Sequence, residues 1–137
     1  MKLKILITVS ALIFSKDSFS ADLYFNVGKA TPYLSICSLK NDLYESGTVV
    51  DFTNEVLSKI YHASDEPKKK IVAEGADEFL LQLEYQSALG VTKEDELYSL
   101  PRCERHAVTV LKQMCSDKTS EFIPSKPTCE KAKQYFK

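Results

Sequence analysis

Apolar residues recur along most of the chain at intervals of three and four positions, the spacing of an amphipathic α-helix. Three segments show this spacing most clearly. Their apolar stripes are Val49, Thr53, Val56, Leu57 and Ile60; Val72, Ala76, Phe79, Leu80 and Leu83; and Cys103, Ala107, Val110, Leu111 and Met114. A stripe of this kind buries one face of a helix against a core. The pattern therefore predicts an all-α fold.

Capping and helix-breaking residues divide the chain where helices are expected to begin and end. The expected boundaries are Thr31-Pro32 for the start of the first helix, Gly47-Thr48 between the first and second, Asp65-Glu66-Pro67 between the second and third, Gly90 at the end of the third, Thr92–Asp95 at the start of a short fourth, Pro101 for the fifth, and Pro127 or Thr128 for the last. Asp22–Val27 is expected to be extended, and Thr48–Phe52 is a second strand candidate. The expected architecture is a five- or six-helix bundle with a short extended N-terminal segment.

The first 20 residues have the pattern of a secretory signal peptide. Lys2 and Lys4 precede an apolar run from Ile5 to Phe14, and a polar stretch follows. Ser18 and Ser20 meet the small-residue requirement of a cleavage site, so we expect cleavage after Ser20. This apolar run is shorter than the roughly 20 residues that span a bilayer, and no other segment is longer, so we expect no stable membrane insertion after cleavage.

Residues 21–137 are expected to form one domain that works in the periplasm or as a secreted protein. The absence of an Asn-x-Ser/Thr glycosylation site favours the periplasm. Without the four charged residues of the leader, three basic and one acidic, the 18 basic and 19 acidic residues become 15 and 18, a net charge of −3. That balance argues against a nucleic-acid partner, because nucleic-acid binders carry a clear basic excess.

The four cysteines, Cys37, Cys103, Cys115 and Cys129, are expected to form two disulfides, because exported proteins meet an oxidising environment. Cys103 and Cys115 cannot pair with each other, since a helix would hold them about 18 Å apart. Of the two remaining pairings, an antiparallel return of the last helix favours Cys115–Cys129 together with Cys37–Cys103. The segment between Cys103 and Cys115 is then a helix fastened at both ends.

A metal site is the alternative use of these residues. Cys103 and His106 have a ligand-like spacing that Cys115, Cys129 or His62 could complete, but the sequence has no second tight pair of the kind that structural zinc uses. The Cys-x-x-Cys motif of redox catalysts is also missing, as are the common hydrolase and phosphate-loop motifs. We therefore expect a non-catalytic protein without a metal or other cofactor.

Charged residues of the third helix are the candidate contact site for a partner. The candidates are the acidic residues Glu74, Asp77, Glu78 and Glu84 and the basic run Lys68, Lys69 and Lys70. The acidic residues fit an exposed helix face, and the sharper hypothesis is a docking face for a basic protein partner. The three lysines suit a basic contact site, or a solvated turn balanced by Asp65 and Glu66.

In its layout of leader, single helical domain and paired cysteines, the chain is similar to small exported helical proteins of Gram-negative bacteria. These include periplasmic immunity proteins, which neutralise a rival cell's secreted toxin, and acid-stress chaperones. The resemblance implies a protein that binds another protein, such as a secreted toxin or effector, by occlusion. A stress chaperone is the alternative, and a small metalloprotein or hydrolase is a third. A homodimer through an apolar helix face is compatible with each.

Overall fold

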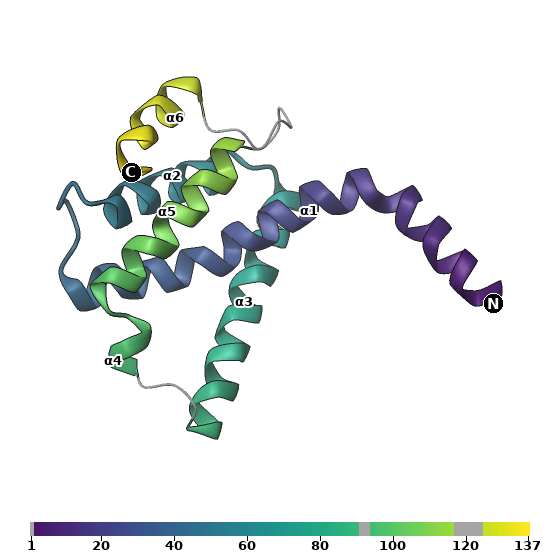
Figure 1. Cartoon of the computed structure of the whole chain (residues 1–137), viewed down its shortest axis with the longest axis horizontal. Coiled ribbons are helices and arrows are strands. Elements are labelled where there is room, and N and C mark those ends of the chain that lie inside the picture. Colours follow the sequence, from purple (N-terminus) through teal and green to yellow (C-terminus); the bar gives the residue numbers. More distant parts are fainter. Residues whose placement is uncertain (1, 91–93, 117–124) are drawn as a thin grey trace.

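The computed structural model describes the backbone of residues 2–90, 94–116 and 125–137, and the side chains of residues 22–90, 95–116 and 125–137. Its helices are α1 (Lys2–Asn41), α2 (Val49–Ala63), α3 (Glu66–Leu89), α4 (Glu94–Leu97), α5 (Leu100–Ser116) and α6 (Lys126–Ala132), followed by the 3₁₀ turn Lys133–Tyr135. The described chain contains no strand. The all-α, six-helix fold is confirmed, and Figure 1 shows α2, α3 and α5 arranged around α1.

The expected extended segment Asp22–Val27 is wrong, because these residues belong to α1. Leu23, Tyr24 and Val27 are buried and continue the helical spacing of the apolar residues that follow them. Helix α1 also runs through Gly28 and Pro32, the residues expected to interrupt and begin a helix. Thr48–Phe52 is not a strand either, since Thr48 caps α2 and Val49 begins it.

The other expected helix boundaries agree with the structure where its description covers them. The Thr48 side chain accepts a hydrogen bond from the Asp51 backbone N–H at 3.3 Å, and the Asp65 side chain accepts one from Lys68 at 3.0 Å. Both are N-cap bonds that satisfy otherwise unpaired donors at a helix start. Gly90 ends α3 with φ of 65°, a conformation that favours glycine. The expected Thr92 start of α4 and the leader side chains lie outside the described residues.

The core is the apolar space between α1, α2 and α5. Its fully buried side chains include Leu34 of α1, Val50 and Leu57 of α2, and Leu111 and Met114 of α5. A polar contact crosses the same interface, where the Asn54 amide of α2 donates hydrogen bonds to the Ser38 hydroxyl at 2.7 Å and to the Leu34 carbonyl at 3.2 Å. These bonds fix the register of α2 along α1.

Helix α3 crosses α1 in backbone-to-backbone contact. A Cβ at Gly28 would overlap the Val72 carbonyl, and a Cβ at Gly75 would overlap the Phe25 carbonyl. Only glycine allows two helices to approach so closely. Val72 and Gly75 are buried at this crossing, whereas the following turns of α3 are largely exposed and diverge from α5 (Figure 1).

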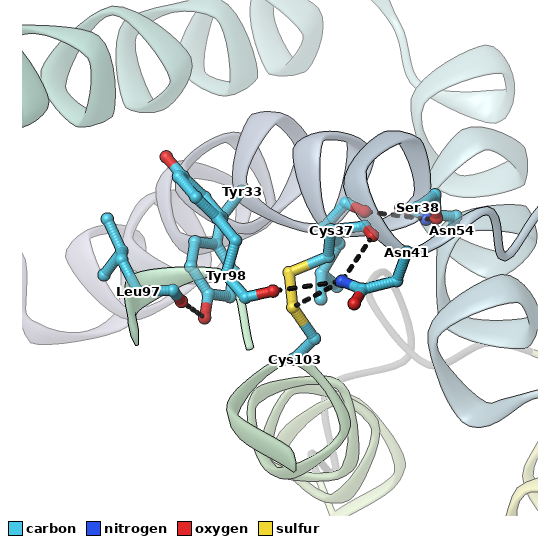
Figure 2. Close-up of a disulfide and its surroundings, with 9 residues drawn as sticks. Tyr33, Cys37, Ser38, Asn41, Asn54, Leu97, Tyr98 and Cys103 are labelled. Atoms are coloured by element: carbon cyan, nitrogen blue, oxygen red, sulfur yellow. Dashed lines mark hydrogen bonds between the residues drawn. A yellow bond between two sulfur atoms is a disulfide. The ribbon is translucent and has the colours of Figure 1, made fainter. Parts of the chain in front are cut away.

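Two disulfides join Cys37 to Cys103 and Cys115 to Cys129, which is the pairing that the sequence favoured. Figure 2 shows the first, between α1 and α5, where both cysteines are fully buried. The Asn41 amide beside it donates a hydrogen bond to the Tyr98 carbonyl at 3.0 Å, so the disulfide and this bond together attach the start of α5 to α1. The second disulfide attaches α6 to the end of α5. None of the helices, over the residues described, is long and apolar enough to cross a membrane.

Candidate functional site

The four acidic candidates of α3 lie on its outward side. Glu74, Asp77 and Glu84 are exposed, and Glu78 is half-buried. At 100° per residue they fall on the half of the helix opposite Val72 and Gly75, the residues that contact α1. The structure therefore gathers all four carboxylates on one side of one helix.

Two large apolar side chains, Leu81 and Tyr85, lie among these carboxylates. Leu81 is 61% exposed and Tyr85 is 67% exposed. The outward face of α3 is thus the set Glu74, Asp77, Glu78, Leu81, Glu84 and Tyr85. Sequence reasoning missed its apolar members, although three consecutive apolar residues, Phe79 to Leu81, cannot all point to one side of a helix.

The three lysines at the start of α3 are divided between two environments. Lys68 lies 3.6 Å from the Asp65 carboxylate and over the ring of Tyr24, and Lys69 lies 3.9 Å from Glu66 and over the ring of Tyr61. These two lysines are engaged within the protein's own surface, whereas Lys70 is exposed. The lysine run is therefore partly balanced by Asp65 and Glu66, and its use as a contact site stays a prediction.

On its other side, the C-terminal half of α3 faces an open groove of about 780 Å³, which α1, α5 and Leu97 of α4 complete. The apolar part of the groove lining comprises Ala30, Tyr33, Phe79, Leu83, Leu97 and Val110. Tyr33 organises this surface. Its ring contacts Phe79 and His106, at centroid distances of 6.1 and 4.6 Å, and its hydroxyl donates a 2.7 Å hydrogen bond to the Leu97 carbonyl.

Over the part of the chain that the structure describes, the charged side chains of the groove lining are basic. They are Lys29, Arg102 and Arg105, and no described carboxylate lines the groove. Burial raises the pKa of the Tyr33 phenol above its ordinary value, although the nearby guanidinium groups of Arg102 and Arg105 act to lower it. The His106 ring packs against Tyr33, and partial burial lowers the pKa of His106. Sequence reasoning missed this surface, because its residues come from four helices and their proximity depends on tertiary packing.

The cysteines and histidines do not assemble into a reactive site. Cys103, Cys115 and Cys129 form disulfides, so they cannot act as the thiolate ligands of a metal ion. His106 packs against Tyr33, and His62 lies in the last turn of α2. Within the described ranges, no three His, Cys, Asp or Glu side chains are placed to hold a metal ion.

Comparison with protein-family models gives no match, and comparisons with curated proteins and with solved structures also give none.

Proposed function

We propose that the protein is exported and acts as a non-catalytic binding protein of the immunity or inhibitor type, which occludes a partner protein. The outward face of α3 is the proposed contact surface. The partner is a protein with a basic surface, such as a secreted toxin or effector. The two disulfides support the exported part of the proposal, because such bonds persist in oxidising compartments.

The exposure of Leu81 and Tyr85 is the observation that carries the binding proposal. Cores of protein interfaces are enriched in aromatic residues, and Tyr combines a large contact area with few rotatable bonds. The surrounding Glu74, Asp77 and Glu84 form a polar rim that attracts and orients a basic partner. The exposed pair therefore supplies the apolar centre of an interface, and the carboxylates supply its rim.

The way in which α3 is anchored also supports binding. Its N-terminal half is held at the glycine crossing with α1, and α1 is bonded covalently to α5. A surface held in its binding conformation loses little conformational entropy when a partner docks. The scaffold thus presents the outward face of α3 without a folding step.

Site-specific photocrosslinking tests this proposal. A benzophenone amino acid is placed at position 81 or 85, or at the exposed position 131 of α6 as the control, and the protein is expressed in its own host. We expect one protein other than this chain itself to crosslink from positions 81 and 85 and not from position 131. With that protein purified, Tyr85→Ala should weaken affinity about thirtyfold, the effect of a 2 kcal/mol hot spot. Equal crosslinking from position 131, or an unchanged affinity for the variant, contradicts the proposal.

A stress chaperone is the second candidate, and the exposure of further apolar residues on α3 favours it. Leu80 is 46% exposed and Leu89 is 57% exposed, in addition to Leu81 and Tyr85. A chaperone would use this apolar surface without selecting one partner. Suppression of the aggregation of unrelated acid-denatured proteins, lost in Leu81→Lys, would favour this function over selective binding.

A further inference from the structure

The groove between α3 and α5 has the length of a docking site for one short helix. Its α5 wall is the stripe Arg102, Arg105, His106, Thr109, Val110 and Gln113. This stripe covers three helical turns, or about 16 Å, at 1.5 Å per residue. The floor from α1 and the opposite wall from α3 each cover two turns. Amphipathic helices commonly bind in grooves of this form, with the apolar face inward.

The basic lining of the groove favours a helix that carries acidic side chains. Among the lining residues whose side chains the structure describes, the charged ones are Lys29, Arg102 and Arg105, beside the titratable His106. None of these three cations forms an ion pair with another residue whose side chain the structure describes. An occupant with an apolar centre and carboxylates along its edges would cover the apolar lining and neutralise the cations.

The outward face of α3 has these properties. Leu81 and Tyr85 form its exposed apolar centre, and Glu78 and Glu84 lie on opposite edges of that centre. The groove and the outward face occupy different sides of the same helix half, so one copy of the protein can offer both at once. Two copies can therefore satisfy each other's surfaces under twofold symmetry, which closes the assembly at a dimer.

We propose that the groove is a docking site for α3 of a second copy. Leu81 and Tyr85 of each copy cover the Tyr33, Phe79 and Val110 surface of the other, and the carboxylates of α3 pair with Arg102 and Arg105. The dimer covers the same face that the proposed partner would use, so the partner and the second copy compete. This self-association does not rest on the proposed function, because it concerns the purified protein alone.

Sedimentation velocity of the purified oxidised protein tests the proposal. We expect a dimer at about 100 μM, a concentration that populates a complex with a micromolar Kd, and partial dissociation as salt rises. Arg102→Glu with Arg105→Glu, and separately Glu78→Lys with Glu84→Lys, should each give a monomer, because the like charges then repel. Glu78 and Glu84 are chosen because they lie on opposite edges of the α3 face. One of them therefore lies next to Arg102 and Arg105 in either orientation of the docked helix.

A mixture of the two double variants provides the decisive measurement. Each variant alone repels its own copy, but the acidic groove of the first accepts the basic α3 of the second, and the basic groove of the second accepts the acidic α3 of the first. We therefore expect an equimolar mixture to recover the dimer. Lys126→Glu with Lys131→Glu changes the net charge of exposed α6 as much as the arginine pair does, and it should stay dimeric.

Three results would overturn the proposal. The first is a wild-type protein that stays monomeric at about 100 μM, well above a micromolar Kd. The second is a dimer that neither double variant weakens, or a mixture that stays monomeric. The third is a monomer that binds laurate and loses this binding in Arg102→Glu with Arg105→Glu, which would assign the groove to an anionic amphiphile. Circular dichroism of each variant separates a failure to fold from a failure to associate.

Discussion

Gly28 of α1 lies directly against the backbone carbonyl of Val72 in α3. The relationship is reciprocated one turn along, where Gly75 of α3 lies against the carbonyl of Phe25. Because these contacts are between backbones, no side-chain rotation can make room for a larger residue. The position of α3 therefore depends on the absence of a Cβ at Gly28 and at Gly75. The outward face and the groove depend on it in turn.

Gly28→Ala and Gly75→Ala should each destabilise the protein by about 3 kcal/mol, the upper part of the range for overpacking a close contact. This loss exceeds the gain of up to about 1 kcal/mol that alanine brings inside a helix. Urea unfolding followed by far-ultraviolet circular dichroism measures both effects. Ser87→Ala, at an exposed position of α3, is the control and should change stability little. A glycine variant as stable as this control would contradict the crossing.

The two disulfides should differ in their contribution to stability. Cys37 and Cys103 are 66 residues apart, and Cys115 and Cys129 are 14 apart. Restriction of the unfolded chain then stabilises the protein by about 4 and about 3 kcal/mol, respectively. Alanine replacement of the Cys37–Cys103 pair should therefore lower the free energy of unfolding more, since it also removes buried sulfur packing.

The Cys115–Cys129 disulfide should be reduced before the Cys37–Cys103 disulfide. Cys115 and Cys129 are half-buried, whereas Cys37 and Cys103 are fully buried, so a thiol reagent reaches the 115–129 bond first. Timed alkylation during mild dithiothreitol treatment, followed by peptide mass spectrometry, measures the order. Earlier labelling of Cys37 than of Cys129 would show that the first disulfide is accessible.

The Asn54 amide should be worth more than an average surface hydrogen bond, because it satisfies the fully buried hydroxyl of Ser38. Asn54→Ala should cost about 1–2 kcal/mol, since it leaves that hydroxyl without its partner. Combining it with Ser38→Ala should cost less than the sum of the single changes, because both changes remove the same hydrogen bond. Chemical denaturation of all four members of the cycle measures the coupling, with exposed Glu55→Ala as the control.

Stability should fall as the pH drops below about 6.5, the ordinary pKa of histidine. Burial lowers the pKa of His106 in the folded protein, so the unfolded chain binds a proton at a higher pH than the folded chain does. The neutral His106 therefore contributes fully to the free energy of unfolding above about pH 6.5. This contribution is lost as the pH falls from about 6.5 to the lowered pKa of the folded protein. Urea midpoints from pH 7.5 to 5 should fall less steeply in His106→Gln; an equal slope would assign the effect to other groups.

The exported protein should begin at Ala21 and should contain no free thiol. Cleavage after Ser20 keeps Leu23 and Tyr24, which are buried in the fold and which a later cut would remove. Intact mass spectrometry of the natural product, with and without reduction, should show a shift of four hydrogens for two disulfides. A retained leader or a chain that alkylates without reduction would contradict export.

The sequence was sufficient to predict features that depend on local chemistry. Thr48, Asp65 and Gly90 mark helix ends through their own side-chain or backbone preferences, and the rise of a helix excluded a Cys103–Cys115 bond. The prediction that Asp22–Val27 is extended was wrong because six residues are too few to separate the two-residue repeat of a strand from the repeat of about 3.6 residues of a helix. The prediction that Gly28 interrupts the chain was wrong because glycine occurs both at helix ends and where two helices cross closely.

The candidate sites were predictable only in part. The four carboxylates of α3 share one side because of helical spacing, which the sequence contains. Whether Leu81 and Tyr85 are exposed depends on whether another part of the chain packs against the outward side of α3, which no local pattern shows. The basic groove depends on the meeting of Lys29 with Arg102 and Arg105, which are more than 70 positions away, and no local pattern encodes that meeting.

The bond between Cys37 and Cys103 encloses residues 38–102 in a single covalent ring. All of α3 lies within this ring. A protease that cuts once anywhere in it opens the ring without releasing a fragment, because both pieces remain joined through sulfur. The proposed contact surface on α3 would thus stay attached to its scaffold after a first cut, an advantage for the exported binding protein that we propose.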